Sequence, residues 1–296
     1  MNGPGIETSA GAASSGPAGP GVPVEACGEA DREVIGYQAG RLRWLVRRAT
    51  GREITEILDG PDRFLVEPAR LLAHSDLITL GMIPPLVADM PPLLLRRLNY
   101  RRLRHRLRDC FRPTRAERAF RHGLGLEQAG VRTPRVLAAG VERRLRWPVR
   151  AYLLTEFVPD AVTLDQYLTA HRRLPRQLVV RLADLLARLH AQGFSHRDLK
   201  ASNVLFDRAL QPYLIDLDGV RHHGSPNDKE TLANLARLAR EFVVYPSELG
   251  WNAARFLQRY CQQRQRPDSF QPWAKELARR LPRSGGSSRP LMSDHP

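Results

Sequence analysis

The strongest constraint on the fold is one run of residues that follows the clearest predicted helix. Leucines recur at helical spacing between Pro175 and Gly193, which are the residues expected at the start and just past the end of a helix. His196-Arg197-Asp198 follows, with Asn203 five residues after the aspartate, and Asp216 comes after two short apolar stretches. This order predicts a helix, a polar loop and a strand pair that bring the two acids and the amide together.

These residue types suit phosphoryl transfer, which needs a positioned hydroxyl and cations that neutralise phosphate oxygens. Asp198 can accept a hydrogen bond from the acceptor hydroxyl as the catalytic base, and Lys200 can reach a γ-phosphate as a point charge. Asn203 and Asp216 offer the oxygen ligands that Mg²⁺ prefers. The spacing matches the catalytic loop HRDxxxxN, so the sequence predicts a kinase that uses ATP and Mg²⁺.

The order of predicted elements gives the fold class. Residues 31–158 contain short apolar stretches and one helical stretch over 114–128, whereas residues 159–283 are mainly helical. The prediction is therefore an α+β, protein-kinase-like, two-lobed fold. Its small antiparallel β lobe with one helix covers 31–158, and its larger, mainly α lobe with the catalytic loop covers 159–283. Residues 1–30, rich in Gly, Pro, Ser and Ala, predict a disordered tail, and 284–296 a flexible one.

The charge of the chain is unusual. Its formal net charge is +15, and eleven arginines lie between Arg96 and Arg121, where only Asp109 and Glu117 oppose them. A GC-rich genome and a solvated surface would explain this. An electropositive face for an anionic membrane surface or a phosphorylated saccharide is the functional alternative. Nucleic acid is the least favoured partner, because no recognised binding module is present.

The remaining composition favours a cytoplasmic protein. The start of the sequence lacks the pattern of a signal peptide, and the most apolar stretch, 77–95, contains Asp89 and four prolines. Three separated cysteines without a CxxC pair indicate neither a zinc site nor a disulfide framework. We expect a cytoplasmic location, with peripheral binding to the inner membrane left open.

At residues 40–260 the sequence resembles the bacterial lipopolysaccharide kinases of the InaA type, relatives of the kinases that phosphorylate heptose or Kdo. The segment 93–140 is what points to this family, whereas the C-terminal part with the catalytic loop is typical of kinase-like folds in general. Within that segment, Gly130 to Pro134 match the Gly-x-x-Thr-Pro element of the family. The resemblance implies an ATP-dependent kinase for a sugar hydroxyl of the lipopolysaccharide core, acting at the cytoplasmic membrane face. The core glycolipid is then the acceptor.

The resemblance also implies the remaining roles. Glu156 to Val158 correspond to the hinge whose backbone binds adenine, and Leu205 corresponds to the apolar floor beneath the ring. Glu117 is the candidate for the helix glutamate that pairs with the nucleotide-anchoring cation, although a solvated surface carboxylate is an equal alternative. The anchoring lysine of the family aligns with Arg96, and no lysine precedes Lys200.

Two departures leave alternatives open. Arginine is not a neutral exchange for that lysine, and no GxGxxG loop is present, so residues 58–83 must cover the phosphates in another way. A pseudokinase or scaffold module is therefore one alternative. A kinase for another small-molecule or protein acceptor is a second, although no Ala-Pro-Glu follows Gly219, which disfavours a protein substrate. For Asp218 we expect a turn cap rather than a second metal ligand. The acceptor hydroxyl and the oligomeric state stay open.

Overall fold

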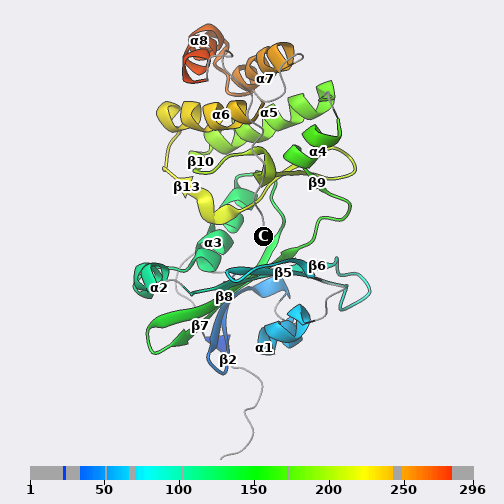
Figure 1. Cartoon of the computed structure of the whole chain (residues 1–296), viewed down its shortest axis with the longest axis vertical. Helices are drawn as coiled ribbons and strands as arrows, with labels where there is room; N and C mark the ends of the chain where they lie inside the picture. The colour runs from blue at the N-terminus through cyan, green and yellow to red at the C-terminus, as the bar shows by residue number, and fades with distance from the viewer. Residues whose placement is uncertain are drawn as a thin grey trace, which may run out of the picture.

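The computed structural model describes residues 23–24, 34–50, 52–66, 71–101, 103–171, 174–242 and 249–281. It has two lobes stacked along its longest axis, a sheet lobe and a helical lobe, with helix α3 (Arg115–Gln128) between them (Figure 1). The chain passes from the first to the second lobe after Glu156, near the predicted boundary at residue 158. The α+β, kinase-like, two-lobed prediction is confirmed.

Eight strands of the described residues form one antiparallel sheet in the order β1-β2-β3-β7-β8-β6-β5-β4. Their bounds are β1 (Pro23–Val24), β2 (Val34–Ala39), β3 (Leu42–Arg47), β4 (Leu71–His74), β5 (Ile78–Ile83), β6 (Leu93–Asn99), β7 (Val136–Arg144) and β8 (Trp147–Glu156). Within the segment 1–30 that was predicted as a tail, residues 23–24 pair with β2 as the edge strand β1. The rest of that segment, up to residue 30, and all of 284–296 lie outside the described residues.

The two faces of the sheet carry different partners. Along β6, the buried Leu95 packs with the segment of α1 (Thr55–Asp59) and the 3₁₀ helix η3 (Pro61–Leu65), which the sequence did not predict. Leu98 belongs instead to the core shared with α3 and the helical lobe. Because side chains alternate along a strand, Arg96 lies on the face of Leu98, toward the second lobe.

Helix α3 confirms the prediction over 114–128. Thr114 is its N-cap, and Glu117 completes a capping box, which satisfies two amides at the start of the helix. Gly123 lets the helix approach the sheet closely, because a Cβ there would lie 2.5 Å from Val136 Cγ1 and 3.2 Å from Leu217 Cδ1. A second helix, α2 (Leu103–Cys110), lies within the arginine-rich run.

Five helices are described in the helical lobe, and one of them is the helix predicted between Pro175 and Gly193. They are α4 (Leu164–Ala170), α5 (Arg176–Ala191), α6 (Asp228–Phe242), α7 (Leu249–Gln263) and α8 (Phe270–Arg280). Its strands are short: β9 (Val162–Thr163), β10 (Phe194–His196), β11 (Val204–Phe206), β12 (Pro212–Leu214) and β13 (Val220–His222). Among the described residues, no helix is both long and apolar enough to cross a bilayer.

A buried polar network connects the helices of this lobe to the catalytic loop. His190 is fully buried on α5, with Nδ1 2.9 Å from the Tyr260 hydroxyl and Nε2 3.3 Å from Asn234 Oδ1. Asn234 Oδ1 also accepts from the His196 backbone amide at 2.7 Å. Burial lowers the pKa of His190 to about 4, so the ring is neutral at neutral pH. The network therefore fixes the strand from which the catalytic loop begins.

Two glycines of α3 provide a matched test of the close approach. Gly123→Ala should destabilise the fold by about 1–3 kcal/mol, because its methyl group would overlap Val136. Gly125→Ala meets only ordinary contact with Phe194, at 3.4 Å, and should be neutral or stabilising by up to about 1 kcal/mol through helix propensity. Urea unfolding of the two variants measures the difference. Equal effects of both substitutions would contradict the proposed contact.

His190 also predicts a pH dependence of stability. Its pKa is lower in the folded state, about 4, than the ordinary value of 6.5, so the unfolded state binds a proton first as the pH falls. The unfolding free energy should therefore decrease between about pH 6.5 and pH 4, by on the order of 3 kcal/mol from this group. In His190→Gln the unfolding free energy, measured by denaturant titration, should change less with pH across that window. An unchanged pH dependence would exclude His190 as its source.

Candidate active site

The catalytic loop lies between two short antiparallel pairs. β10 pairs with β13 through His196 and Val220, and β11 pairs with β12 through Val204 and Leu214. Just beyond the second pair, the Ile215 amide donates to the Asn203 carbonyl at 3.0 Å. Asn203 and the segment leading to Asp216 are therefore neighbours, as the predicted strand pair requires.

Asp198 is the most open of the three predicted residues. Its side chain is 61% exposed, and Oδ2 lies 3.1 Å from Lys200 Nζ. The buried Asn203 donates from Nδ2 to the Asp198 backbone carbonyl at 2.8 Å, which fixes the loop around the acid. The carboxylate of Asp198 is thus presented to solvent beside a cation, from a backbone that is held in place.

Asp216 has a strained backbone and a cross-lobe partner. Its φ of 59° lies in the left-handed region, which only a few non-glycine residues adopt. Its Oδ1 accepts from Arg96 Nη1 at 2.8 Å, and its backbone oxygen is 3.2 Å from His196 Nε2. Burial alone would raise the pKa of Asp216, but the charge and the hydrogen bond of Arg96 outweigh burial and lower it. Asp216 is therefore an anion held between the lobes.

Helix α3 holds the turn that follows Asp216, the 3₁₀ helix η6 (Leu217–Gly219). Arg115 Nε donates to Asp218 Oδ2 at 2.5 Å, and His122 Nδ1 lies 2.9 Å from the Leu217 carbonyl. Burial lowers the pKa of His122, which favours a neutral ring that donates from Nδ1. Asp218 therefore pairs with α3 through its side chain, where we had expected a turn cap.

Glu117 lies away from the position that the resemblance implied. Its carboxylate accepts from the Thr114 amide at 2.6 Å and the Thr114 hydroxyl at 2.8 Å, and Arg143 Nη2 is 3.9 Å away. The third residue of a helix lies beside its own N-cap, which explains this engagement. In the described residues Arg96 pairs with Asp216 instead of a helix glutamate, so the expected Arg96–Glu117 pair is wrong for this conformation.

The predicted hinge connects β8 to β9. The amides of Glu156 and Phe157 are already used, donating to the Arg135 carbonyl at 2.9 Å and the Pro92 carbonyl at 2.8 Å. The described residues provide no backbone partner for the Val158 amide, which leaves it for a ligand. Leu205 is half-buried in β11, between the buried Val204 and Phe206, so it faces the opposite side of the strand. These placements are compatible with the adenine-binding roles, which stay predictions.

The segment 58–83, which lacks a glycine-rich loop, contains the β4–β5 hairpin. β4 and β5 are joined by a turn over residues 75–77, and β5 pairs with β6 so that Leu80 lies opposite Arg96. The turn is closed by the Ser75 amide donating to the Ile78 carbonyl at 2.7 Å, and Asp76 pairs with Arg101 at 3.0 Å. A Ser-Asp turn was the available sequence signal for this hairpin.

The donor set fits a magnesium ion bound together with a nucleotide. Within the described part of the chain, no cluster of three or more His, Cys, Asp or Glu side chains could hold a metal alone. The side-chain nitrogen of Asn203 donates to the Asp198 backbone carbonyl, so the side-chain oxygen of Asn203 is left for a cation. One amide oxygen and one carboxylate, from Asp216, suit an ion that keeps its other positions for phosphates and water.

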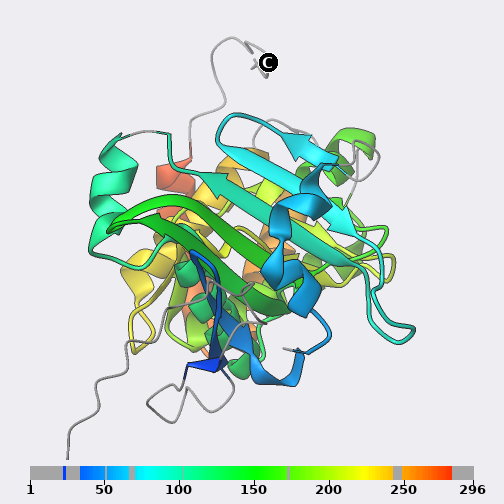
Figure 2. The same ribbon diagram turned by 90° about the horizontal axis from the view of Figure 1, so that it is seen from below.

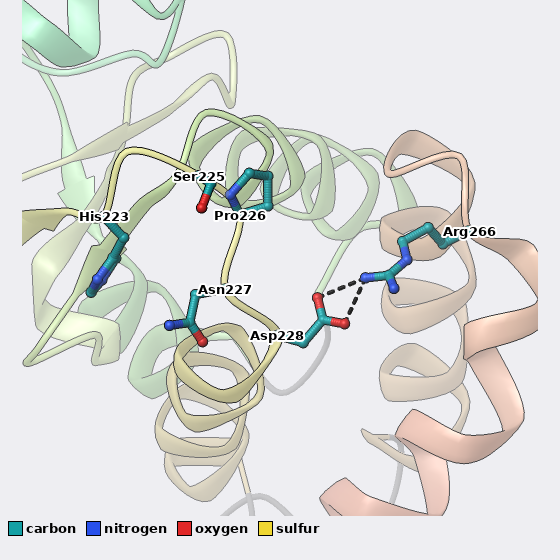
Figure 3. Close-up of a pocket in the computed structure, with 6 residues that line it drawn as sticks. All are labelled: His223, Ser225, Pro226, Asn227, Asp228 and Arg266. Carbon is teal, nitrogen blue, oxygen red and sulfur yellow. Dashed lines mark hydrogen bonds and ion pairs between the residues drawn. The ribbon is translucent and has the colours of Figure 1, made fainter.

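A separate pocket of about 470 Å³ lies in the helical lobe after β13 (Figure 3). The residues that line it are His223, Ser225, Pro226, Asn227, Asp228 and Arg266. Asp228 neutralises Arg266 through contacts of 2.6 and 2.7 Å, drawn as dashed lines in Figure 3. None of Asp198, Asn203 and Asp216 lines this pocket, so the candidate active site lies elsewhere.

The fold has a solved counterpart. A structure described as WaaP in complex with acyl carrier protein matches with a TM-score of 0.56. The match covers 80% of this chain and 97% of the other, at 16% sequence identity. At this identity the likeness concerns the fold alone.

Three sequence relatives are described as 3-deoxy-D-manno-octulosonic acid kinases. The protein of Vibrio parahaemolyticus is 34% identical over 130 residues, which cover 44% of this chain and 52% of the relative. The protein of Actinobacillus succinogenes is 33% identical over 140 residues, covering 46% and 57%. That of Stenotrophomonas maltophilia R551-3 is 37% identical over 138 residues, covering 46% and 53%. The chain thus spans about half the length of the curated relatives it matches.

A family model described as "Lipopolysaccharide kinase (Kdo/WaaP) family" matches residues 94–260, more than half of the chain. The matched region begins two residues before Arg96 and contains the whole catalytic loop together with Asp216. The chain therefore belongs to the lipopolysaccharide kinase (Kdo/WaaP) family.

Proposed function

We propose that this protein is an ATP- and Mg²⁺-dependent kinase that phosphorylates a sugar hydroxyl of the lipopolysaccharide core, with Kdo (3-deoxy-D-manno-octulosonic acid) as the acceptor sugar. The observation that carries the proposal is the arrangement of Asp198, Asn203 and Asp216 around one loop in a member of this family. The descriptions of its relatives support Kdo over heptose. A lipid-linked acceptor would place the reaction at the cytoplasmic face of the inner membrane.

Asp198 and Lys200 form the part of the site that meets the reacting groups. The exposed carboxylate would accept a hydrogen bond from the sugar hydroxyl, orient its oxygen toward the γ-phosphate and receive the proton as the bond from that oxygen to the γ-phosphorus forms. The bond between the γ-phosphorus and the β,γ-bridging oxygen breaks in the same step, and ADP leaves. Lys200, 3.1 Å from that carboxylate, is close enough to pair with the transferred phosphoryl group.

Asn203, Asp216 and Arg96 form the part that holds the nucleotide. Mg²⁺, when bound by Asn203 and Asp216, supplies the charge that neutralises the phosphate oxygens. Before the nucleotide arrives, Arg96 keeps the Asp216 carboxylate ionised and in position. The guanidinium is then adjacent to the phosphates and can pair with them once Asp216 binds the cation.

The same ion pair favours the second candidate, a pseudokinase. A guanidinium donating at 2.8 Å to the metal-binding carboxylate competes with Mg²⁺ for it. If Arg96 stays bound to Asp216 and excludes Mg²⁺, the protein keeps its fold, has no turnover and acts as a binding module. Nucleotide binding and turnover therefore have to be measured separately.

Removal of the proposed base should abolish transfer. Asp198→Asn keeps the size of the side chain but cannot accept the proton, so the rate of phosphate transfer from labelled ATP to core glycolipid should fall by about 10²–10⁴-fold. Asp160→Asn is the control, because Asp160 is also exposed, at 63%, and lies in the turn after the hinge. Transfer by Asp198→Asn at the control rate would rule out this mechanism.

Thermal shift with Mg²⁺ and ATP tests the role of Arg96. We expect a higher Tm for the wild type in the presence of both ligands, and an equal or larger shift for Arg96→Lys, because lysine makes a less directional pair with Asp216. Arg96→Met should lose most of the shift. No shift in the wild type or Arg96→Lys, combined with no turnover in either protein, would favour the pseudokinase.

A further inference from the structure

Exposed apolar side chains gather at one corner of the sheet lobe. Eight large apolar side chains in the described residues are exposed, and four of them lie on α2, just after it, or in the turn between β7 and β8. These four are Leu103, Leu107, Phe111 and Leu145, with exposed fractions of 63%, 52%, 79% and 93%. We call them the apolar corner. In both Figure 1 and Figure 2, α2 lies beside the free end of the β7–β8 hairpin, at the edge of the molecule.

Helix α2 is oriented with its apolar side outward. Leu103, Leu107 and Phe111 are spaced four residues apart, so they share one side of the helix and its C-terminal extension. The inward side is polar: the fully buried Asp109 accepts from the Tyr100 hydroxyl at 2.8 Å and pairs with Arg108 at 2.8 Å. A surface helix normally buries its apolar side, so this orientation needs a partner outside the chain.

The β7–β8 turn adds a second, independent apolar tip. Leu145 has a φ of 57°, a conformation that turns usually reserve for glycine or asparagine, and it is almost fully exposed. Packing within the chain does not explain a leucine there. Two contacts tie the turn to α2: Cys110 Sγ lies 3.4 Å from the Arg146 carbonyl, and Arg143 Nη1 donates to the Asp109 carbonyl at 3.1 Å. The two tips therefore project as one unit.

Arginines lie next to the apolar corner in the sequence, Arg112 after Phe111 and Arg144 and Arg146 on either side of Leu145. All three are exposed, and no ion pair of their side chains is found among the described residues. Apolar side chains flanked by cations match the interface of a bilayer that contains anionic lipids, where the apolar groups enter the acyl boundary and the cations meet headgroups. A second copy of this chain would bring the same cations together, which opposes self-association through this corner.

We propose that the apolar corner docks the protein on an anionic lipid bilayer. The inference rests on the proposed function in one respect, because a lipid-linked acceptor gives the kinase a reason to work at a membrane. The short segment 111–114 joins α2 to α3, whose first residue, Arg115, pairs with Asp218 beside the catalytic loop. Docking at this corner therefore holds the N-terminal end of α3, which contacts the active site, on the side of the molecule that faces the membrane.

Vesicle co-sedimentation tests docking without any need for catalysis. The wild-type protein should bind vesicles of phosphatidylcholine with phosphatidylglycerol, and binding should fall in pure phosphatidylcholine and at high salt. The double variant Phe111→Ser with Leu145→Ser should reduce the partition coefficient on anionic vesicles by about tenfold or more. The matched control is Val66→Ser with Val87→Ser, two exposed apolar residues outside the corner, which should bind like the wild type.

The outcomes separate docking from the proposed function. Asp198→Asn should bind vesicles like the wild type even though it does not transfer phosphate. Equal binding by the corner variant and the wild type would overturn the proposal, as would a wild type that ignores anionic vesicles. Loss of phosphorylation of a delipidated core sugar by the corner variant would also overturn it, because the corner would then serve the active site itself.

Discussion

The ion pair between Arg96 and Asp216 joins the two lobes at the point where chemistry is expected. Arg96 comes from the interior strand β6, and Asp216, two residues after the end of β12, has a left-handed backbone conformation. The pair keeps a half-buried carboxylate ionised, because the guanidinium offsets the cost of burial. Arginine in place of lysine makes this contact directional, so a metal ion would have to displace the guanidinium in order to bind Asp216.

The catalytic loop could be predicted from sequence because local spacing determines it. Asp198 and Asn203 lie on one short loop, and a strand pair brings Asp216 back to it, so the geometry needs few long-range contacts. The position of Glu117 could not be predicted in the same way. Whether a helix carboxylate faces its own N-cap or a distant strand depends on how the helix packs, and the capping box with Thr114 competes with any longer-range pair.

The arginine-rich run shows the same limit. Its composition left a solvated surface and an electropositive face equally open, because charge alone does not tell which side of a helix is buried. In the structure the polar side of α2 is the buried one: Asp109 is fully buried and accepts a hydrogen bond from the Tyr100 hydroxyl, whereas Leu107 and Phe111 are exposed. The β4–β5 hairpin was missed because its turn, with Ser75 and Asp76, lacks the glycines that a search for a phosphate loop relies on.

We propose that a nucleotide-associated divalent cation binds Asn203 and Asp216 and displaces Arg96 from Asp216. Crystals grown with Mn²⁺ and a non-hydrolysable ATP analogue test it through the anomalous signal of manganese. We predict a peak within bonding distance of both the Asn203 and the Asp216 side-chain oxygens, with the Arg96 guanidinium moved to the phosphates. A bound nucleotide with no peak at these two residues, and with the Arg96–Asp216 pair intact, would exclude Asn203 and Asp216 as the cation ligands.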